Sequence, residues 1–195
     1  MKTQIKLLLA ATLTSLLFYS CSNSNTDNEE SVDNSEISNT LHMAFKTPDW
    51  ERFINCEHLD LMPIESNNVF GVSATSASTN ETFYFTYPKD SSAMRDPGNL
   101  KRYPIADYLE NSQNFEFSQK LPLSDGNSDR LISKAGLSED SYNEVMAIEY
   151  VGTETNYALF KVKCRYKMKT YVLNDPSKIK DVSGTFHFKI RTKKK

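Results

Sequence analysis

Residues 160–169 read FKVKCRYKMK, and this stretch gives the clearest secondary-structure signal in the chain. Apolar and basic residues alternate along it without a break. The apolar members are Phe160, Val162, Cys164, Tyr166 and Met168, and the basic members are Lys161, Lys163, Arg165, Lys167 and Lys169. Because successive side chains of a β-strand point to opposite faces, the pattern predicts a strand with an apolar inner face and a basic outer face.

The sequence around this strand predicts partners for it. Residues 143–151 and 156–171 indicate a hairpin of long strands with a turn at 152–155, and residues 184–191 indicate a closing strand. If the closing strand pairs beside the first, Lys189 and Arg191 extend the same basic face, with Lys193 and the last two lysines trailing. Residues 143–151 are the least certain strand, because their apolar positions also fit a helical face. Residues 69–75, 82–87 and 115–118 indicate shorter strands.

The earlier part of the folded region favours helices. Thr47-Pro48-Asp49 fits a helix start, with threonine as N-cap and proline at the first helical position. The apolar residues that follow fall near one helical face, namely Trp50, Phe53, Ile54 and Leu61. Residues 105–109 predict a short helix, and residues 129–135 predict another that ends at Gly136.

The expected fold class is therefore α+β. Short N-terminal helices would pack on a mainly antiparallel sheet whose longest strands are C-terminal. A helix on a curved sheet, as in cystatin-like or nuclear-transport-factor-like proteins, is one candidate arrangement, suggested by element order alone.

The first forty residues differ in composition from the rest. Lys2 and Lys6 precede a largely apolar run at 7–19, which Ser20 and Cys21 close. This order is typical of a secretory signal, and the run is shorter than the ~20 residues that span a membrane. Residues 22–40 contain five acids, no base and no aromatic, so we expect a disordered tether.

Residues 17–21, LFYSC, resemble the lipobox of bacterial lipoproteins, and the Ser/Asn/Asp-rich tether is similar to those of the Bacteroidota. The resemblance implies a signal peptide at 1–20, a lipidated Cys21 at the mature N-terminus, a tether to residue 40 and a folded domain at 41–195. It also implies a palmitate-type anchor in the membrane lipid of a Gram-negative cell envelope, with the outer membrane as the expected location. An ordinary signal peptide with cleavage nearby is the alternative.

If Cys21 carries lipid, Cys56 and Cys164 remain. An even number of cysteines in an oxidising compartment predicts a disulfide between them, and the alternative is two separate buried thiols. The sequence contains no Cys/His cluster and no HExxH, so we expect no metal and no cofactor.

The charge balance bears on partners. The whole chain carries −2, while residues 41–195 hold 21 bases and 20 acids. A nearly neutral domain argues against a nucleic-acid partner. The candidate anion-binding face comprises Lys161, Lys163, Arg165, Lys167, Lys169, Lys189 and Arg191. It would suit a lipid headgroup phosphate, lipopolysaccharide, an acidic glycan or an acidic protein; otherwise it is a solvated sheet face that discourages edge-to-edge aggregation.

No GxSxG motif or phosphate-binding glycine loop is present, and no catalytic residue stands out. We therefore expect a membrane-anchored envelope lipoprotein with a non-catalytic binding or assembly domain. The alternative is a small envelope hydrolase acting on glycan or peptide. A deep cleft with converging carboxylates, or a histidine beside a hydroxyl, would favour the enzyme.

Overall fold

The structure is a computed structural model that describes residues 37–195, which belong to one compact unit. The expected signal peptide, Cys21 and the tether as far as residue 36 lie outside the described residues. Within residues 37–195, no helix has both the length and the apolar character needed to cross a membrane.

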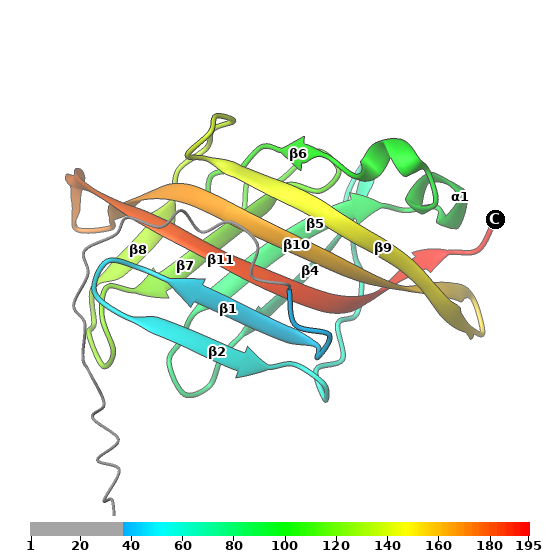
Figure 1. The fold of residues 1–195 in the computed structure, drawn as a ribbon, viewed down its shortest axis with the longest axis horizontal. Helices are drawn as coiled ribbons and strands as arrows, with labels where there is room; N and C mark the ends of the chain where they lie inside the picture. The colour runs from blue at the N-terminus through cyan, green and yellow to red at the C-terminus, as the bar shows by residue number, and fades with distance from the viewer. Residues whose placement is uncertain (1–36) are drawn as a thin grey trace, which may run out of the picture. The chain divides into compact units, whose positions relative to one another are not determined.

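Eleven strands join in one antiparallel sheet (Figure 1). The early strands are β1 (His42–Lys46), β2 (Glu51–Asn55), β3 (Ile64–Glu65), β4 (Val69–Thr75), β5 (Thr82–Pro88) and β6 (Arg102–Tyr103). The later strands are β7 (Phe117–Pro122), β8 (Arg130–Ser133), β9 (Tyr142–Glu154), β10 (Tyr157–Val172) and β11 (Asp175–Lys193). Their order in the sheet is β2-β1-β11-β10-β8-β7-β5-β4-β3, with β9 between β10 and β6.

The expected α+β class is wrong. The described chain is nearly all antiparallel sheet, and no short N-terminal helices pack on it. Its one α-helix is α1 (Ser91–Met94), followed by the 3-10 turn η1 (Pro97–Asn99), and both fall in a stretch between β5 and β6. The sequence therefore forms sheet even where its apolar spacing suggested helix.

The expectation that the longest strands are C-terminal agrees with the structure. Strands β9, β10 and β11 have 13, 16 and 19 residues. One edge of β10 pairs with β11 along its whole length, while β9 and then β8 share the other edge. The sheet forks where β10 changes partner from β9 to β8.

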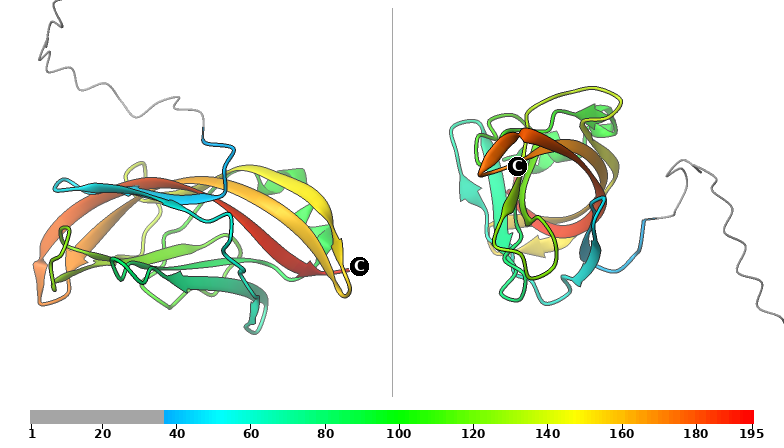
Figure 2. Two further views of the ribbon diagram at one scale, coloured as in Figure 1. Left: turned by 90° about the horizontal axis from the view of Figure 1, so that it is seen from below. Right: turned by 90° about the vertical axis from the view of Figure 1, so that its left-hand side faces the viewer.

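Seen end on, the strands curve around one interior (Figure 2). Aromatic side chains from β5, β7 and β11 meet there. The ring centroid of Phe186 lies 5.0 Å from that of Phe85 and 5.1 Å from that of Phe117, and all three side chains are fully buried. This aromatic cluster joins the β10–β11 part of the sheet to the β5–β7 part.

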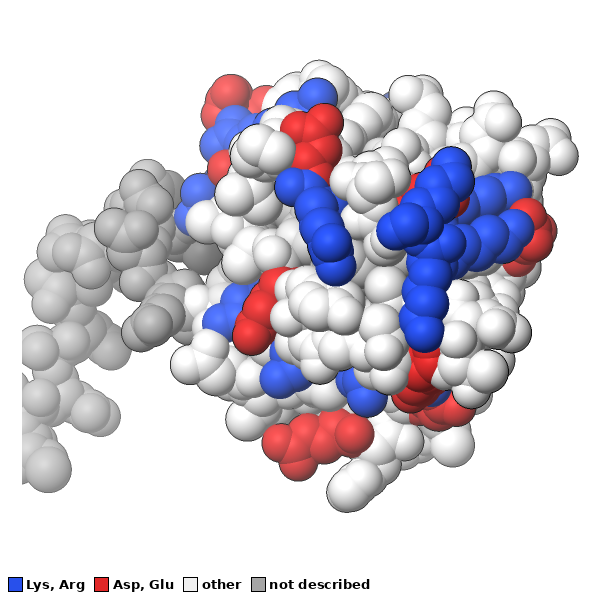
Figure 3. Space-filling view, turned by 90° about the vertical axis from the view of Figure 1, so that its right-hand side faces the viewer, with Lys and Arg blue, Asp and Glu red and all other residues white. Residues whose placement is uncertain are grey.

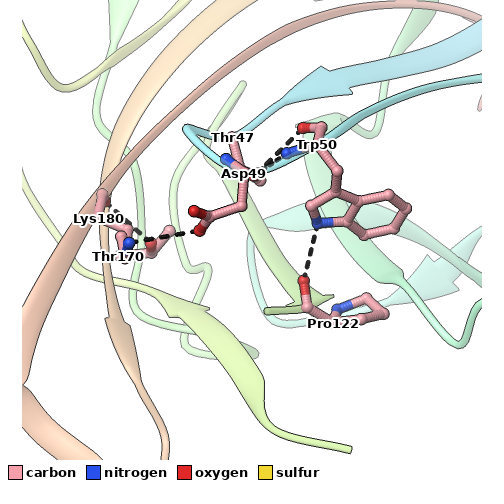
Figure 4. A network of polar contacts seen from close by, with 6 residues as sticks. All are labelled: Thr47, Asp49, Trp50, Pro122, Thr170 and Lys180. Atoms are coloured by element: carbon pink, nitrogen blue, oxygen red, sulfur yellow. Dashed lines mark hydrogen bonds and ion pairs between the residues drawn. The ribbon is translucent and has the colours of Figure 1, made fainter. Parts of the chain in front are cut away.

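The helix predicted to begin at Thr47 is instead the turn between β1 and β2 (Figure 4). The hydroxyl oxygen of Thr47 accepts hydrogen bonds from the backbone N–H groups of Asp49 and Trp50, each at 3.1 Å. The Thr47 N–H donates to the Trp50 carbonyl at 2.8 Å, which closes the hairpin. A threonine side chain bonds the next N–H groups in the same way in a turn and at a helix N-cap, so the local signal fits both.

The other two predicted helices are also wrong. Residues 130–133 form β8, and Gly136 exchanges backbone hydrogen bonds of 2.9 and 3.0 Å with Ile105 instead of capping a helix. Residues 105–109 are a loop in which the Ala106 N–H donates to the Phe117 carbonyl at 3.0 Å. In both segments, pairing with a distant part of the chain prevails over the local signal.

Candidate functional site

Strand β10 has the two faces that its alternation predicts. Phe160, Val162, Cys164, Tyr166 and Met168 point inward, and none is more than 2% exposed. The basic residues between them are partly exposed on the opposite face. Lys161 lies directly opposite Lys189 on β11, which places both on that face. We call the outward bases the outer row: Lys161, Lys163, Arg165, Lys167, Lys169, Lys189 and Arg191.

Some members of the outer row are paired with carboxylates. The Arg165 Nε donates to Glu144 of β9 at 2.7 Å. The Lys169 Nζ lies 2.5 Å from a carboxylate oxygen of Asp181, which is opposite it on β11. These two cations are therefore largely neutralised by acids of the neighbouring strands.

Arg191, at the other end of the outer row, forms ion pairs with two acidic side chains. Its guanidinium contacts Glu154 at 2.7 Å and Asp60 at 2.5 Å. The hydrogen bond from Arg191 lowers the pKa of the Glu154 carboxyl, and the same bond raises the pKa of Arg191. This end of the outer row is also neutralised.

Three other members of the outer row are different. Among residues 37–195, no carboxylate lies within ion-pair distance of Lys161, Lys167 or Lys189. Glu149 is the β9 register partner of Lys161, yet the two side chains form no ion pair. Four of the seven bases predicted from sequence therefore have no carboxylate partner among the described residues. Three of these, Lys161, Lys167 and Lys189, have no hydrogen-bond partner there either.

Lys163 binds the segment through which the chain enters the sheet, residues 37–41. Its Nζ donates to the Asn39 side-chain oxygen and, at 3.4 Å, to the Ile37 carbonyl. His42 and His187 add to this attachment, since both Nδ1 atoms donate to the Thr40 carbonyl at 2.9 and 3.2 Å. The start of the folded unit therefore lies across the outer row.

The two histidines of this attachment are harder to protonate than a solvated imidazole. Burial lowers the pKa of His42 and of His187, and the positive charge of Lys163 lowers both further. With Nδ1 protonated, the Nε2 of His42 accepts a hydrogen bond from the Thr185 hydroxyl at 2.9 Å.

His42 and Thr185 form the kind of histidine–hydroxyl pair that the hydrolase alternative requires. His42 is only 1% exposed, and the Phe53 ring stacks on it with centroids 5.0 Å apart. Neither of the pockets described below includes His42 or Thr185. The pair is therefore placed to fix residues 37–41 on the sheet, with its imidazole shielded from any substrate.

The trailing lysines do not extend the outer row. Lys193 lies 2.9 Å from Glu65, which also pairs with Lys89 at 3.0 Å, and Lys195 lies 2.6 Å from Asp90. Figure 3 shows this end of the unit, where basic and acidic side chains lie side by side. These ion pairs join the end of β11 to the β3–β5 region.

Among the surface pockets of residues 37–195, two bear on these side chains. One, of about 180 Å³, joins Lys189 and Arg191 to Leu41 and residues 57–60. The other, of about 330 Å³, lies between Lys134, Tyr171 and the β10–β11 turn. Acidic Glu57 and Asp60 line the first pocket, so it is not a simple anion site. The first pocket also holds His58 beside these two carboxylates, but it is small for a ligand cleft, and Asp60 is ion-paired with Arg191. Neither pocket is lined by a serine or threonine hydroxyl.

The predicted disulfide is absent from the structure. Cys56 and Cys164 are both buried free thiols. Cys56 directly follows β2, and β1 and β11 separate β2 from β10, so the two strands are roughly 14 Å apart along the sheet. A disulfide needs Cα atoms within about 7 Å. The prediction rested on the even number of cysteines and on the expected compartment, and neither of these fixes how far apart the two residues lie.

The described residues 37–195 contain no group of three or more His, Cys, Asp or Glu side chains placed to hold a metal ion. Comparisons with protein-family models, with curated proteins and with solved structures found no match to this chain. The outer row and the segment attached to it are therefore the features of the described residues that bear on function.

Sequence reasoning found the outer row but missed how the structure divides it. The acids that neutralise it are scattered from Asp60 to Asp181, and no local pattern connects them to their bases. It also missed the attachment through Thr40, His42 and His187. A buried histidine on the same strand face as basic residues is a weak signal for such a contact, and the sequence offers no stronger one.

Proposed function

We propose that this protein is an envelope lipoprotein, anchored through Cys21, whose folded unit binds anionic lipid headgroups through the unpaired lysines of the outer row. Lys161, Lys167 and Lys189 carry the proposal, because they are the cations of this face with neither a carboxylate nor a hydrogen-bond partner among the described residues. They share one sheet face, and Lys161 and Lys189 are direct register partners.

The attachment of residues 37–41 supports a membrane as the partner. Lys163 and the two histidines hold this segment on the outer row. A chain anchored at Cys21 therefore reaches the folded unit on the face that carries the unpaired lysines. Fifteen residues lie between Cys21 and Ile37, so the length of chain limits how far that face can lie from the anchor.

The expected contribution is modest and additive. A lysine near an anionic membrane surface contributes about 1 kcal/mol, so three contribute about 3 kcal/mol, or on the order of 100-fold in affinity. Exposed charges attract over about 8 Å at physiological salt, so the interaction should weaken as salt rises. Stable anchoring needs two membrane signals, and the lysines would supplement the acylated cysteine.

Binding to vesicles tests the lipid contact apart from the anchor. The chain from residue 21 onward, with Cys21→Ala, should bind phosphatidylglycerol vesicles and not phosphatidylcholine vesicles. Changing Lys161, Lys167 and Lys189 together to Gln should reduce binding on the order of 100-fold. A matched variant with Gln at Lys120, Lys134 and Lys178 loses the same charge elsewhere and should bind nearly as well as the parent. Equal losses in the two variants would mean that net charge, and not this face, governs binding.

The anchor has its own test. In cells given a labelled fatty acid, the parent chain should incorporate label and the Cys21→Ala chain should not. Incorporation that persists after the substitution would contradict lipidation at Cys21, whatever the vesicle assay shows.

A further inference from the structure

The larger of the two pockets described above shares no residue with the outer row. Its volume is about 330 Å³, which is within the range of small-molecule sites. One acid, one base and four residues with largely apolar side chains line it, namely Asp107, Lys134, Ala135, Tyr171, Pro176 and Ile179. An apolar lining with a few charged groups is typical of a site that orients a small ligand.

Tyr171 and Ile179 form the apolar part of this pocket. They are register partners on β10 and β11, so their side chains lie next to each other on one sheet face. Ile179 is 46% exposed, although it is a large apolar residue. A ligand whose apolar group covered this pair would remove that surface from water, which is favourable.

Asp107 and Lys134 bring opposite charges to the same pocket. The Asp107 Oδ1 accepts a hydrogen bond from the Ala135 N–H at 2.8 Å, and its Oδ2 has no partner among residues 37–195. The Lys134 ammonium has neither a carboxylate nor a hydrogen-bond partner in that part of the chain, so the two groups do not pair with each other. A ligand that carries both charges would satisfy each group with a charge-assisted hydrogen bond.

The backbone that carries these two charges is fixed by contacts between strands. Asp107 follows Ala106, whose carbonyl accepts a hydrogen bond of 3.0 Å from the Ser133 hydroxyl of β8. The Lys134 N–H donates to the Lys169 carbonyl of β10 at 2.9 Å. The backbone of both residues is therefore already held in place, and a ligand would not have to order a loop on binding.

We propose that this pocket binds a free α-amino acid with an apolar side chain. The ammonium of the ligand donates to Asp107, its carboxylate accepts from Lys134, and its side chain covers Tyr171 and Ile179. A free amino acid carries one cation, one anion and one apolar group on the same carbon, which matches the three parts of the lining. Either terminus of a peptide offers only one of the two charges. This binding is independent of the proposed lipid contact, because the outer row takes no part in it.

Leucine and three relatives of it test whether all three parts of the ligand are recognised. Binding is followed through the backbone amide signals of a ¹⁵N-labelled chain from residue 21 onward, with Cys21→Ala. Leucine should shift the amides of residues 107, 134–135, 171 and 177–179. N-acetyl-leucine lacks the cation and leucinamide lacks the anion, so each should bind at least about tenfold more weakly. Glycine lacks the apolar group and should also bind more weakly than leucine.

Two conservative variants test the charges of the protein. Asp107→Asn keeps an oxygen that accepts from the Ala135 N–H but loses the negative charge, and Lys134→Gln loses the positive charge. Each should weaken leucine binding at least about tenfold. Lys178→Gln changes a β11 lysine that does not line the pocket, so it should leave leucine binding unchanged. Unshifted amide signals elsewhere in the unit show that each variant is folded.

Four results would overturn the proposal. The first is that millimolar leucine shifts no amide of the pocket, and the second is that its shifts lie elsewhere in the unit. The third is unchanged leucine binding in Asp107→Asn or in Lys134→Gln. The fourth is that leucinamide binds as tightly as leucine, because a peptide N-terminus would then fit equally well. Vesicle binding decides none of these results, so the lipid contact and the amino-acid site fail or stand separately.

Discussion

The inner and outer faces of the β10–β11 pair are built from alternate residues of the same strands, yet their surroundings differ. The inner face is closed, and its residues contact aromatic rings from the opposite part of the sheet. The outer face is partly open: Arg165, Lys169 and Arg191 form ion pairs there, whereas Lys161, Lys167 and Lys189 do not. Stability should therefore depend on the inner face and binding on the outer face, so substitutions on the two faces should have separable effects.

The largest expected effect is on the inner face, at Phe186. Its fully buried ring lies between Phe85, Phe117 and Phe188, so Phe186→Ala removes the centre of the aromatic cluster. We expect a loss of about 3–5 kcal/mol in the free energy of unfolding, measured by urea denaturation. Lys189→Ala on the outer face should change that free energy by no more than about 0.5 kcal/mol. Similar losses in both variants would contradict the division between the faces.

A second inner-face prediction concerns the cysteines. Burial raises the pKa of Cys56 to about 11 and raises the pKa of the fully buried Cys164 well above its usual range. At neutral pH the reactive thiolate of Cys56 is then roughly 100-fold rarer than in an exposed cysteine. In the Cys21→Ala chain, a thiol-reactive dye should label neither residue until denaturant is added, and should then label both without any reductant. Fewer than two thiols in denaturant would show that these cysteines pair.

The sequence predicted β10 well because the strand carries its whole pattern locally. Its inner residues meet the core and its outer residues meet solvent, so alternation alone identifies both faces. The same held for β4, whose bounds Val69–Thr75 match the prediction. The seven candidate bases were likewise found on one face, because strand parity fixes which way each points.

The helices were predicted wrongly because their signals were local and the decisive contacts were distant. Trp50 lies in a turn and its indole Nε1 donates to the Pro122 carbonyl at 3.3 Å, while Phe53 is 56% exposed on β2. The apolar spacing of three and four residues that suggested a helix therefore belongs to the β1–β2 hairpin. The division of the outer row was unpredictable for a similar reason, since its acids come from other strands and loops.

Ion pairing within the outer row predicts a smaller difference. Arg165 donates to Glu144, and both side chains are partly buried, whereas Lys167 has no acid partner among residues 37–195. Arg165→Gln should therefore lower the free energy of unfolding by about 1 kcal/mol, and Lys167→Gln by no more than about 0.5 kcal/mol. Vesicle binding should show the reverse order, with Lys167→Gln the more harmful. Urea denaturation and vesicle binding are measured on the same two variants. If Arg165→Gln weakens vesicle binding as much as Lys167→Gln does, an ion pair does not decide whether a base contributes to stability or to binding.

The smallest expected effect is a pH dependence of stability at the attachment of residues 37–41. Burial holds the pKa of His42 and of His187 below the usual value near 6.5, so between pH 7.5 and 5.5 the unfolded chain binds more protons than the folded one. The free energy of unfolding should therefore fall as pH drops through about 6.5 and stay level above about 7.5. His187→Asn keeps a donor toward the Thr40 carbonyl but cannot titrate, so it should flatten part of this slope. His58→Asn removes a histidine that does not contact the Thr40 carbonyl, and it is the matched control for the substitution itself. An unaltered slope in His187→Asn would mean that the pH dependence arises elsewhere in the unit.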